Sequence, residues 1–396
     1  MHASTILRRC LSSVLAPMHA ARCRVLLLAV EALVAGRRLT LTDLARAWPG
    51  AVWMHAPLKA LDRLLSNRHL QQEVRPLHQA MASWLLRSPW PVIVVDWSDL
   101  KADGHWCLLR AAVPMGGRTL TVYERIFPTR QLNSPRAQKA FLKELRHVLP
   151  KGVTPILVTD AGFRSDWFRA VVAQGWHYIG RVRNNTQVCD DATAQWQPCS
   201  ALHARALPRP RELGAYRIVK GQPLACRLVL ARRRRRHREL LTRRGTPQQG
   251  TQALKARKSA REPWLLATSL PAASRSAAQI VAAYAQRMQI EEAFRDLKSH
   301  RYGMGFEDSL TRSAKRLTVL LLLHTLAIFA AWLMGRAAAA SGPHDPLTRQ
   351  VKHRARYSCV HRGLAWLRRR WLPPDMRTSI APQALAHHLT CGAINA

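Results

Sequence analysis

Acidic residues are the scarce class in this chain. Its 396 residues contain 23 Asp and Glu against 62 Lys and Arg, which gives a formal net charge of +39. Such a surplus points to a polyanionic partner, because neutralising phosphates releases counterions and supplies affinity whatever the sequence. Nucleic acid is the first candidate, and an anionic membrane surface is the second.

Cysteine spacing gives no sign of a zinc site or a disulfide framework. None of the eight cysteines belongs to a CxxC pair, the spacing that would indicate either. We expect them to be reduced, small apolar residues of a cytoplasmic protein. They are Cys10, Cys23, Cys107, Cys189, Cys199, Cys226, Cys359 and Cys391.

Long apolar runs are also few. Cys23–Gly36 follows a basic start, but Glu31 interrupts it and no small-residue cleavage site is clear, so a signal peptide is a weak interpretation. Leu317–Met334 is nearly long enough to span a bilayer, yet it carries His324 in its middle and has no companion span. We expect a buried core helix there, no membrane segment, and a cytoplasmic, nucleoid-associated protein.

The first 85 residues have the pattern of short helices. We expect helices at Cys23–Ala35, Leu41–Ala47 and Pro57–Ser66, with Thr40 or Thr42 as the N-cap of the second. Such a basic bundle suits DNA binding, and a plain helical subdomain explains it too. The basic residues in question are Arg37, Arg38, Arg46, Lys59, Arg63 and Arg68.

The periodicity changes to that of a β-sheet at residue 90. Pro91–Val95 is an apolar, β-branched run that ends at Asp96, which is typical of a central strand buried on both faces. Two further strands, at His105–Val113 and Thr119–Ile126, flank the glycine pair at 116–117. That pair predicts a hairpin.

The next stretch alternates helices and strands. A helix is expected from Ser134-Pro135 to about Leu149, and Thr154–Thr159 is a second apolar strand that leads to Asp160. A helix at about Arg164–Gln174 and a strand at His177–Val182 follow. This β-β-β-α-β-α-β order predicts an α/β fold with a ribonuclease H-like core.

A third acidic residue of interest lies in the stretch YAQRMQIEEAFRDLK. Read as one helix, it places Tyr284, Arg287 and Lys298 within about 40° of Glu291, with Arg295 beside them. Most mixed-charge helices of this kind are simply solvated.

Asp96, Asp160 and Glu291 together suggest a metal site. Strand ends on a rigid sheet can hold carboxylates with the accuracy that a metal pair needs. Hard oxygen ligands, without a histidine cluster or thiolates, favour Mg²⁺ or Mn²⁺. Two such ions can activate a water and stabilise a departing 3′ oxygen in phosphodiester transfer.

The motifs resemble those of a large family of bacterial insertion-sequence DDE transposases. The Tyr-x2-Arg-x3-Glu-x6-Lys series at positions 284, 287, 291 and 298 is similar to the family signature. The segments VIVVDWSDL at 92–100 and TDAGFRSDWF at 159–168 resemble its two aspartate blocks. The resemblance covers roughly residues 20 to 340.

The resemblance implies a cut-and-paste enzyme with two Mg²⁺ ions per site, for which Mn²⁺ could substitute. It implies Asp96, Asp160 and Glu291 as the catalytic metal ligands, with Tyr284, Arg287 and Lys298 near the DNA end. Its substrates would be the double-stranded inverted-repeat ends and target DNA. It also implies a homodimer in the DNA-bound complex and a hairpin intermediate of the kind formed by hairpin-type relatives.

Other acidic residues near these positions are weaker candidates. Asp99 lies three residues beyond Asp96, which we expect to close the strand. Glu292 points about 100° away from the Tyr-Arg-Lys stripe. We expect Glu124, in the middle of a strand, to be an ordinary surface residue.

A long insertion separates the second aspartate from the glutamate helix, at about residues 184–262. It contains a predicted strand pair, Tyr216–Val219 and Leu224–Ala231, and then the run RRRRRHR. By resemblance we expect this β-rich insertion to contact the transposon end, with Arg232, Arg233 and Arg234 on phosphates. An arginine run alone more often forms a solvated patch.

Trp264 opens the apolar segment WLLATSL before the glutamate helix. The resemblance implies that it stacks on a base flipped from the DNA end; a core tryptophan is an equally good interpretation. Many relatives have tryptophan after the signature arginine, where this chain has Met288, a residue that stacks less well on a base.

The sequence thus predicts three regions. Residues 1–85 form a helical DNA-binding domain, residues 86–336 the ribonuclease H-like catalytic domain, and residues 337–396 a basic helical tail that could support dimerisation. Three other functions stay open here. They are an inactive or domesticated DNA-binding protein, a two-metal nuclease without strand transfer, and a membrane-associated basic protein.

Overall fold

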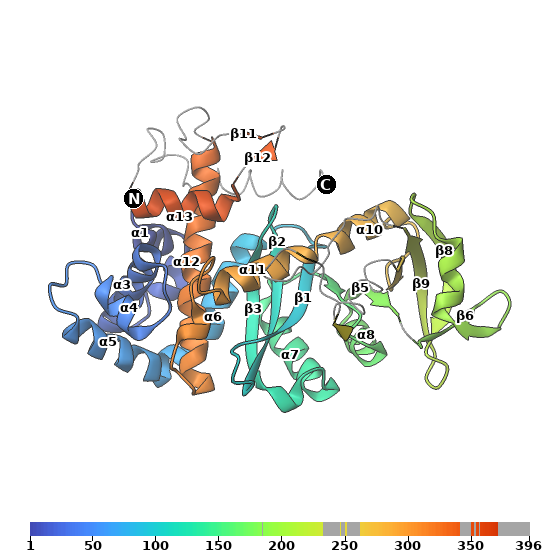
Figure 1. Cartoon of the computed structure of the whole chain (residues 1–396), viewed down its shortest axis with the longest axis horizontal. Coiled ribbons are helices and arrows are strands. Elements are labelled where there is room, and N and C mark those ends of the chain that lie inside the picture. Colours follow the sequence, from blue (N-terminus) through green and yellow to red (C-terminus); the bar gives the residue numbers. More distant parts are fainter. Residues whose placement is uncertain are drawn as a thin grey trace. The chain divides into compact units, whose positions relative to one another are not determined.

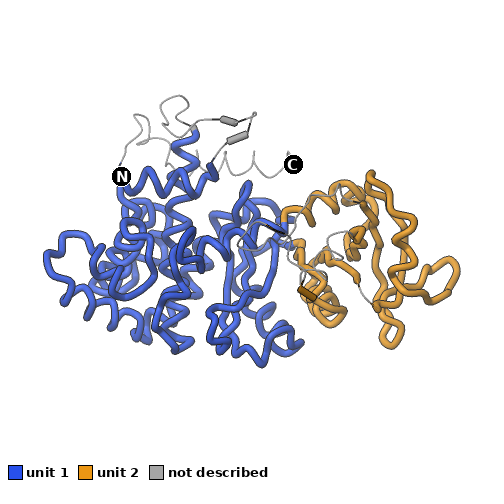
Figure 2. The backbone as a smooth tube through the Cα atoms, in the orientation of Figure 1, with its two compact units in different colours: residues 1–155, 287–396 blue, residues 156–286 orange. Residues whose placement is uncertain are grey.

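The computed structural model describes residues 1–183, 185–232, 246, 250–251, 262–340, 350–351, 354–355 and 357–370. These residues form a mixed α/β structure that is compatible with a ribonuclease H-like core. The chain divides into two units, shown in Figure 2: unit 1 is residues 1–155 with 287–396, and unit 2 is residues 156–286. The predicted three-region division remains a prediction.

Unit 1 begins with helices, and the three predicted ones correspond to α3, α4 and α5 (Figure 1). Thr40 is the N-cap of α4, because its side chain accepts from the backbone N–H of Asp43 at 3.1 Å. The N-terminal helices are α1 (Ala3–Cys10), α2 (Ser12–Leu15), α3 (Ala20–Gly36), α4 (Leu41–Arg46), α5 (His55–Ser66) and α6 (Arg68–Leu85).

A long apolar helix, α12 (Ala314–Ala340), forms the middle of unit 1 and contacts α1, α3, α5, α6 and α13 (Cys359–Arg369). Glycines let α12 and α13 pack closely, since a Cβ on Gly363 would lie 1.6 Å from the carbonyl oxygen of Ala331. Among the described residues α12 is the one helix long and apolar enough to cross a membrane, but its most apolar window is 89% buried. The predicted core helix is confirmed.

An antiparallel three-stranded sheet completes the core of unit 1, in the order β3-β2-β1. Its strands are β1 (Val92–Asp99), β2 (Trp106–Pro114) and β3 (Thr119–Pro128). The prediction that Asp96 closes its strand is wrong, because β2 pairs with β1 as far as Asp99 opposite Cys107. Asp96 is therefore held inside the ladder, opposite Arg110.

Glu124 is a core residue, so the prediction that it lies on the surface is wrong. It is opposite Arg110 in the β2–β3 register and is 6% exposed. The Arg110 guanidinium donates from Nε and Nη2 to Oε2 of Glu124, at 2.9 and 2.7 Å. The hydroxyl of Thr325, on α12, donates to Oε1 at 2.9 Å.

The remaining described elements of unit 1 are short or lie beside the sheet. Ser134 caps α7 by accepting from the N–H of Ala137 at 3.2 Å, with Pro135 in the first turn, as predicted. These elements are η1 (Thr129–Gln131), α7 (Pro135–Val148), α11 (Met288–Lys298), η3 (Phe306–Asp308), β11 (Gln350–Val351) and β12 (Arg354–Ala355).

Unit 2 is built on a sheet with the strand order β4-β5-β10-β9-β8-β6-β7. β4 and β5 are parallel, and the other pairs given for this unit are antiparallel. Its elements are β4 (Ile156–Thr159), α8 (Ser165–Val172), β5 (His177–Val182), β6 (Gln187–Asp190), β7 (Trp196–Pro198), η2 (Cys199–Arg205), β8 (Arg211–Ile218), β9 (Leu224–Ala231), β10 (Trp264–Thr268) and α10 (Ala277–Ala285).

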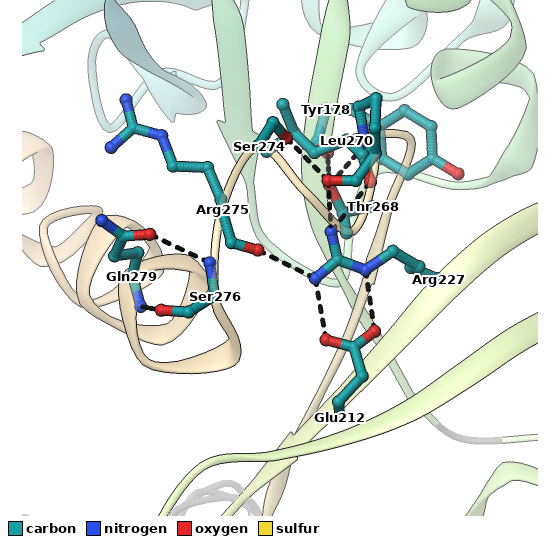
Figure 3. A network of polar contacts seen from close by, with 10 residues as sticks. Tyr178, Glu212, Arg227, Thr268, Leu270, Ser274, Arg275, Ser276 and Gln279 are labelled. Atoms are coloured by element: carbon teal, nitrogen blue, oxygen red, sulfur yellow. Dashed lines mark hydrogen bonds and ion pairs between the residues drawn. The ribbon is translucent and has the colours of Figure 1, made fainter.

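Arg227 on β9 fixes the segment that leads from β10 into α10 (Figure 3). Its Nε and Nη2 each donate to a different oxygen of Glu212, both at 2.7 Å. The same guanidinium donates to the carbonyl oxygens of Leu270, Pro271 and Arg275. Since all five N–H donors of the fork have acceptors, the start of α10 is tied to the β8–β9 hairpin.

Candidate active site

The predicted helix from Tyr284 to Lys298 is two helices. α10 ends at Ala285, a turn covers Gln286 and Arg287, and α11 begins at Met288. The prediction of one continuous helix is therefore wrong. Tyr284 belongs to unit 2, whereas Arg287, Glu291 and Lys298 belong to unit 1.

Within unit 1, Arg287 brings two of the three predicted carboxylates together. Its Nη1 donates to Oδ2 of Asp96 at 3.1 Å, and its Nη2 donates to Oε1 of Glu291 at 2.8 Å. The side chains of Arg287 and Asp96 are 13% and 14% exposed, and that of Glu291 is 44% exposed. One guanidinium thus holds two carboxylates, which leaves a formal charge of −1 on a cluster open to solvent on the glutamate side.

A cavity of about 660 Å³ includes both carboxylates. Three cations, Arg295, Lys298 and Arg301, also line it. The ammonium of Lys298 donates to the backbone oxygen of Asp99 at 3.2 Å, which holds this signature lysine against β1. The family signature pointed to Lys298 and helical periodicity pointed to Arg295, but Arg301 lies beyond the motif and was missed.

The competing acidic residues take other positions. Asp99 is not among the residues that line the cavity, and its side chain lies on the opposite face of β1 from Asp96 because the two are three residues apart. Glu292 pairs with Arg295 on the outer side of α11. Glu307 is exposed and also lines the cavity, but Asp96 and Glu291 are the two acids that share the guanidinium of Arg287.

The position of Glu291 is set by the buried side of its helix. Ile290 and Leu297 are fully buried, and Phe294 is 5% exposed. Arg110 lies over the ring of Phe294, 5.0 Å from its centroid, while Gln289 accepts from the N–H of Gly117 at 3.0 Å. Contacts of α11 with β1, β2 and β3 thus leave the Arg287–Glu291 face directed at Asp96.

Asp160, the remaining predicted ligand, belongs to unit 2. It directly follows β4, and its Oδ1 accepts from the N–H of Gly162 at 2.8 Å. The TDAGF segment therefore forms a tight turn after the strand, with Phe163 buried against Trp167. Across the described residues, no group of three or more His, Cys, Asp or Glu side chains that could hold a metal is found.

The predicted DNA-contacting residues of unit 2 differ in exposure. Trp264 is half-buried at the start of β10, and its ring meets that of Tyr284 edge-on, with centroids 4.7 Å apart. Tyr284 is 3% exposed. Arg232 is exposed directly after β9, and Arg233 and Arg234 lie outside the described residues.

The donors present fit a hard divalent cation. Asp96 and Glu291 offer carboxylate oxygens from a rigid strand and from a helix with a buried face, and such oxygens are the ligands that Mg²⁺ and Mn²⁺ prefer. Glu307 adds a third carboxylate to the cavity wall, so the oxygen donors that a divalent cation needs are present on the same wall as the three cations.

Comparison with known families identifies the domain that contains these residues. A family model described as a transposase DDE domain matches residues 88–330. The chain belongs to this family. None of the curated proteins compared with it matches. Membership gives the chain a transposase-type function on DNA, and transposases of the DDE family normally use divalent metal ions.

Proposed function

We propose that this DDE transposase is encoded by an insertion sequence, cuts DNA at the ends of that element and joins the 3′ ends to target DNA. The observation that supports this most is the pairing of Asp96 and Glu291 on one guanidinium, beside a cavity with three more cations. Carboxylates for metal ions and cations for phosphates are the two requirements of phosphodiester chemistry.

Asp96 and Glu291 are the proposed metal ligands of unit 1, and Asp160 is proposed as the third on its family motif alone. Bound Mg²⁺ or Mn²⁺ ions would supply an activated water and charge stabilisation for the departing 3′ oxygen. No protein nucleophile is then required, so the side chains act by binding and positioning the DNA strand.

The basic residues around the cavity are proposed as phosphate ligands. Lys298 is directed across the cavity toward β1, and Arg287 can offer its planar fork to a phosphate in the same way as to a carboxylate. Arg295, with a 55% exposed side chain, and Arg232 are proposed to contact the DNA backbone farther out.

Trp264 is proposed to stack on an extruded base, with Tyr284 as its edge-on support. The N-terminal helices are proposed to bind the inverted repeat, and the complex is proposed to contain two copies of the chain. Light scattering of the DNA-bound protein would test the last point: a mass corresponding to one copy would contradict it.

The test of the chemistry uses purified full-length protein, Mg²⁺ and a linear DNA that carries the inverted repeats flanking its coding sequence. Cleavage and joined products are resolved on denaturing gels. We expect Asp96→Asn and Glu291→Gln to lower cleavage more than about a hundredfold, since even outer-shell partners of metal ligands contribute about 10–100-fold. DNA binding, measured by gel shift, should persist.

Asp99→Asn and Glu292→Gln are the matched controls. Each removes the same charge within three residues of the proposed ligand but outside the Asp96–Arg287–Glu291 cluster, so both should cleave like the wild type. Cleavage by Glu291→Gln at the wild-type rate would contradict the assignment. Cleavage without joined products would favour a nuclease.

A further inference from the structure

A second cavity in unit 1, of about 440 Å³, adjoins the candidate active-site cavity at Arg295 and Arg301. These two arginines line both cavities. Arg37, at the end of α3, and Arg118, in the β2–β3 hairpin, add two more guanidinium groups, and Ile328 and Leu364 give it an apolar wall. We call this space the basic cavity.

The basic cavity has uncompensated positive charge. Asp296 is the one acidic residue among the described residues that line it, and it pairs with Arg118. Burial, reinforced by the charge of Arg368, lowers the pKa of Arg37. Burial and the charges of Arg37 and Arg118 also lower the pKa of His361, although Asp296 opposes this. An anion would relieve this mutual repulsion.

Arg37 has the features of a residue placed for binding. Its backbone adopts the left-handed conformation, with φ 54°, at the C-cap of α3. Glycine is the usual residue at such a helix end because it has no Cβ. In the part of the chain that the structure describes, the buried Nε of Arg37 has no hydrogen-bond partner. The fold thus holds an arginine with a strained backbone at the wall of a basic cavity.

The loop that bears Arg301 and Tyr302 is rigidly attached to α11. The N–H of Met304 donates to the carbonyl of Asp296 at 2.8 Å, and that of Gly303 to Ser299 at 3.0 Å. A Cβ on Gly303 would lie 2.5 Å from the carbonyl oxygens of Arg295 and Asp296, so only glycine permits this approach. Tyr302 is nevertheless 62% exposed, with the Arg301 guanidinium 5.2 Å from its ring centroid.

We propose that the basic cavity binds a backbone phosphate of the DNA strand that passes through the candidate active site, and that Tyr302 stacks on an unpaired base of that strand. The proposal rests on the proposed function in taking DNA as the source of the phosphate. The shared arginines favour a continuous strand, since neighbouring phosphates can then occupy both cavities. An exposed aromatic ring among arginines is the usual construction of a single-strand subsite.

The test measures fluorescence anisotropy of two labelled duplexes, one blunt and one with a three-nucleotide single-stranded overhang. The full-length protein is used without divalent metal so that no cleavage occurs, and salt is varied. Arg301→Gln and Arg37→Gly should each weaken binding about three- to tenfold and reduce the slope of log K against log salt by about one. Arg136→Gln, which removes an exposed arginine on α7, is the matched control and should change neither quantity.

Two variants make the proposal specific. Arg37→Gly removes the guanidinium while relieving the left-handed backbone, so its Tm should equal or exceed that of the wild type although DNA binding weakens. Tyr302→Ala should weaken binding of the overhang duplex about fivefold or more, a modest share of what one stacked base contributes. Binding of the blunt duplex should change much less.

Four outcomes would overturn the proposal. The first is that Arg136→Gln weakens DNA binding as much as Arg37→Gly and Arg301→Gln do. The second is that Arg37→Gly and Arg301→Gln leave the affinity and the salt slope unchanged. The third is that Tyr302→Ala weakens binding of both duplexes equally. The fourth is that deoxyadenosine monophosphate raises the Tm of the wild type but not that of Arg37→Gly, while the two proteins bind DNA equally. The basic cavity would then be a site for free nucleotides. Normal DNA cleavage alongside any of these would leave the proposed function intact, whereas failure of the wild type to bind either duplex would end both.

Discussion

Two arginines of unit 1 hold carboxylates in opposite ways. Arg110 is 1% exposed and gives two hydrogen bonds to Glu124, whose side chain is 4% exposed. Arg287 gives one hydrogen bond each to Asp96 and Glu291, and Glu291 is 44% exposed. The first pair is neutral and closed. The second cluster joins two carboxylates to one guanidinium and is open on one side.

The two groups are neighbours on one face of the sheet. Asp96, Arg110 and Glu124 are directly opposite one another across β1, β2 and β3, so their side chains emerge from the same face. Arg110 is therefore flanked by two carboxylates and pairs with the buried one. By occupying Arg110, Glu124 leaves Asp96 to Arg287 and to the proposed metal ion. A structural ion pair thus lies beside the cluster that is proposed to be functional.

Breaking the buried pair should give the largest effect. Arg110→Met leaves Glu124 charged and without its cation in the core, and removal of one partner of a buried pair costs about 3–5 kcal/mol. We expect urea denaturation to show a loss of that size. The double variant Arg110→Met with Glu124→Leu should recover most of it, because no uncompensated charge remains.

A loss of less than about 1 kcal/mol in Arg110→Met would show that the Arg110–Glu124 pair behaves as a solvent-exposed salt bridge and not as a buried one. The single variant Glu124→Leu sharpens the same point. It frees Arg110 to bind Asp96 in competition with the proposed metal ion. DNA cleavage should therefore fall more in Glu124→Leu than in the double variant, which lacks Arg110.

The strands and caps of this fold were predictable because their signals are local. The β-branched run before Asp96 became β1, and Ser134-Pro135 became the start of α7. The break at residues 286–287 was not predictable, since neither glycine nor proline marks it. Helix α6 was also missed, and it contains Pro76 in its interior.

The site was predictable where a motif identified it and unpredictable where burial decided it. Asp96 and Glu291 could be singled out from their motifs, and the structure joins them through Arg287. Glu124 could not, because a lone glutamate in a strand reads as a surface residue until its partners are known. Those partners, Arg110 and Thr325, are 14 and 201 residues away. Arg37 was identified only as one of the basic residues of the N-terminal helices. The sequence at the end of α3 does not show that this residue lines a cavity.

Lowering the pH should reduce the free energy of unfolding by an intermediate amount, through two histidines buried near the Arg110–Glu124 pair. Burial lowers the pKa of His78 and lowers the pKa of His324 well below its usual value. The charge of Arg110 adds to both shifts, whereas the charge of Glu124 opposes the shift of His78. In the unfolded chain both would titrate near pH 6.5. The unfolded state therefore takes up protons first as pH falls, so stability is intact above about pH 6.5 and is lost below it.

The expected slope is at most about 1.4 kcal/mol per pH unit for each histidine. Denaturation at several pH values between about 5 and 7.5 would measure it. His324→Leu should reduce the slope, whereas Leu326→Val, which changes a nearby buried apolar residue and no titratable group, should leave it unaltered. An equal slope in both variants would mean that the buried histidine is not responsible.

The open cluster should give the smallest change in stability. In Asp96→Asn the guanidinium of Arg287 retains Glu291, 2.8 Å away in the wild type, as its ionic partner. We expect the free energy of unfolding to change by less than about 1 kcal/mol, in either direction, while cleavage is lost. Urea denaturation of this variant beside Arg110→Met would measure the contrast directly. A loss as large as that of Arg110→Met would make Asp96 a structural residue, and the catalytic assignment would then have to rest on another acid. A small change would show instead that Asp96 contributes little to the stability of the fold, as expected of a side chain placed for a ligand.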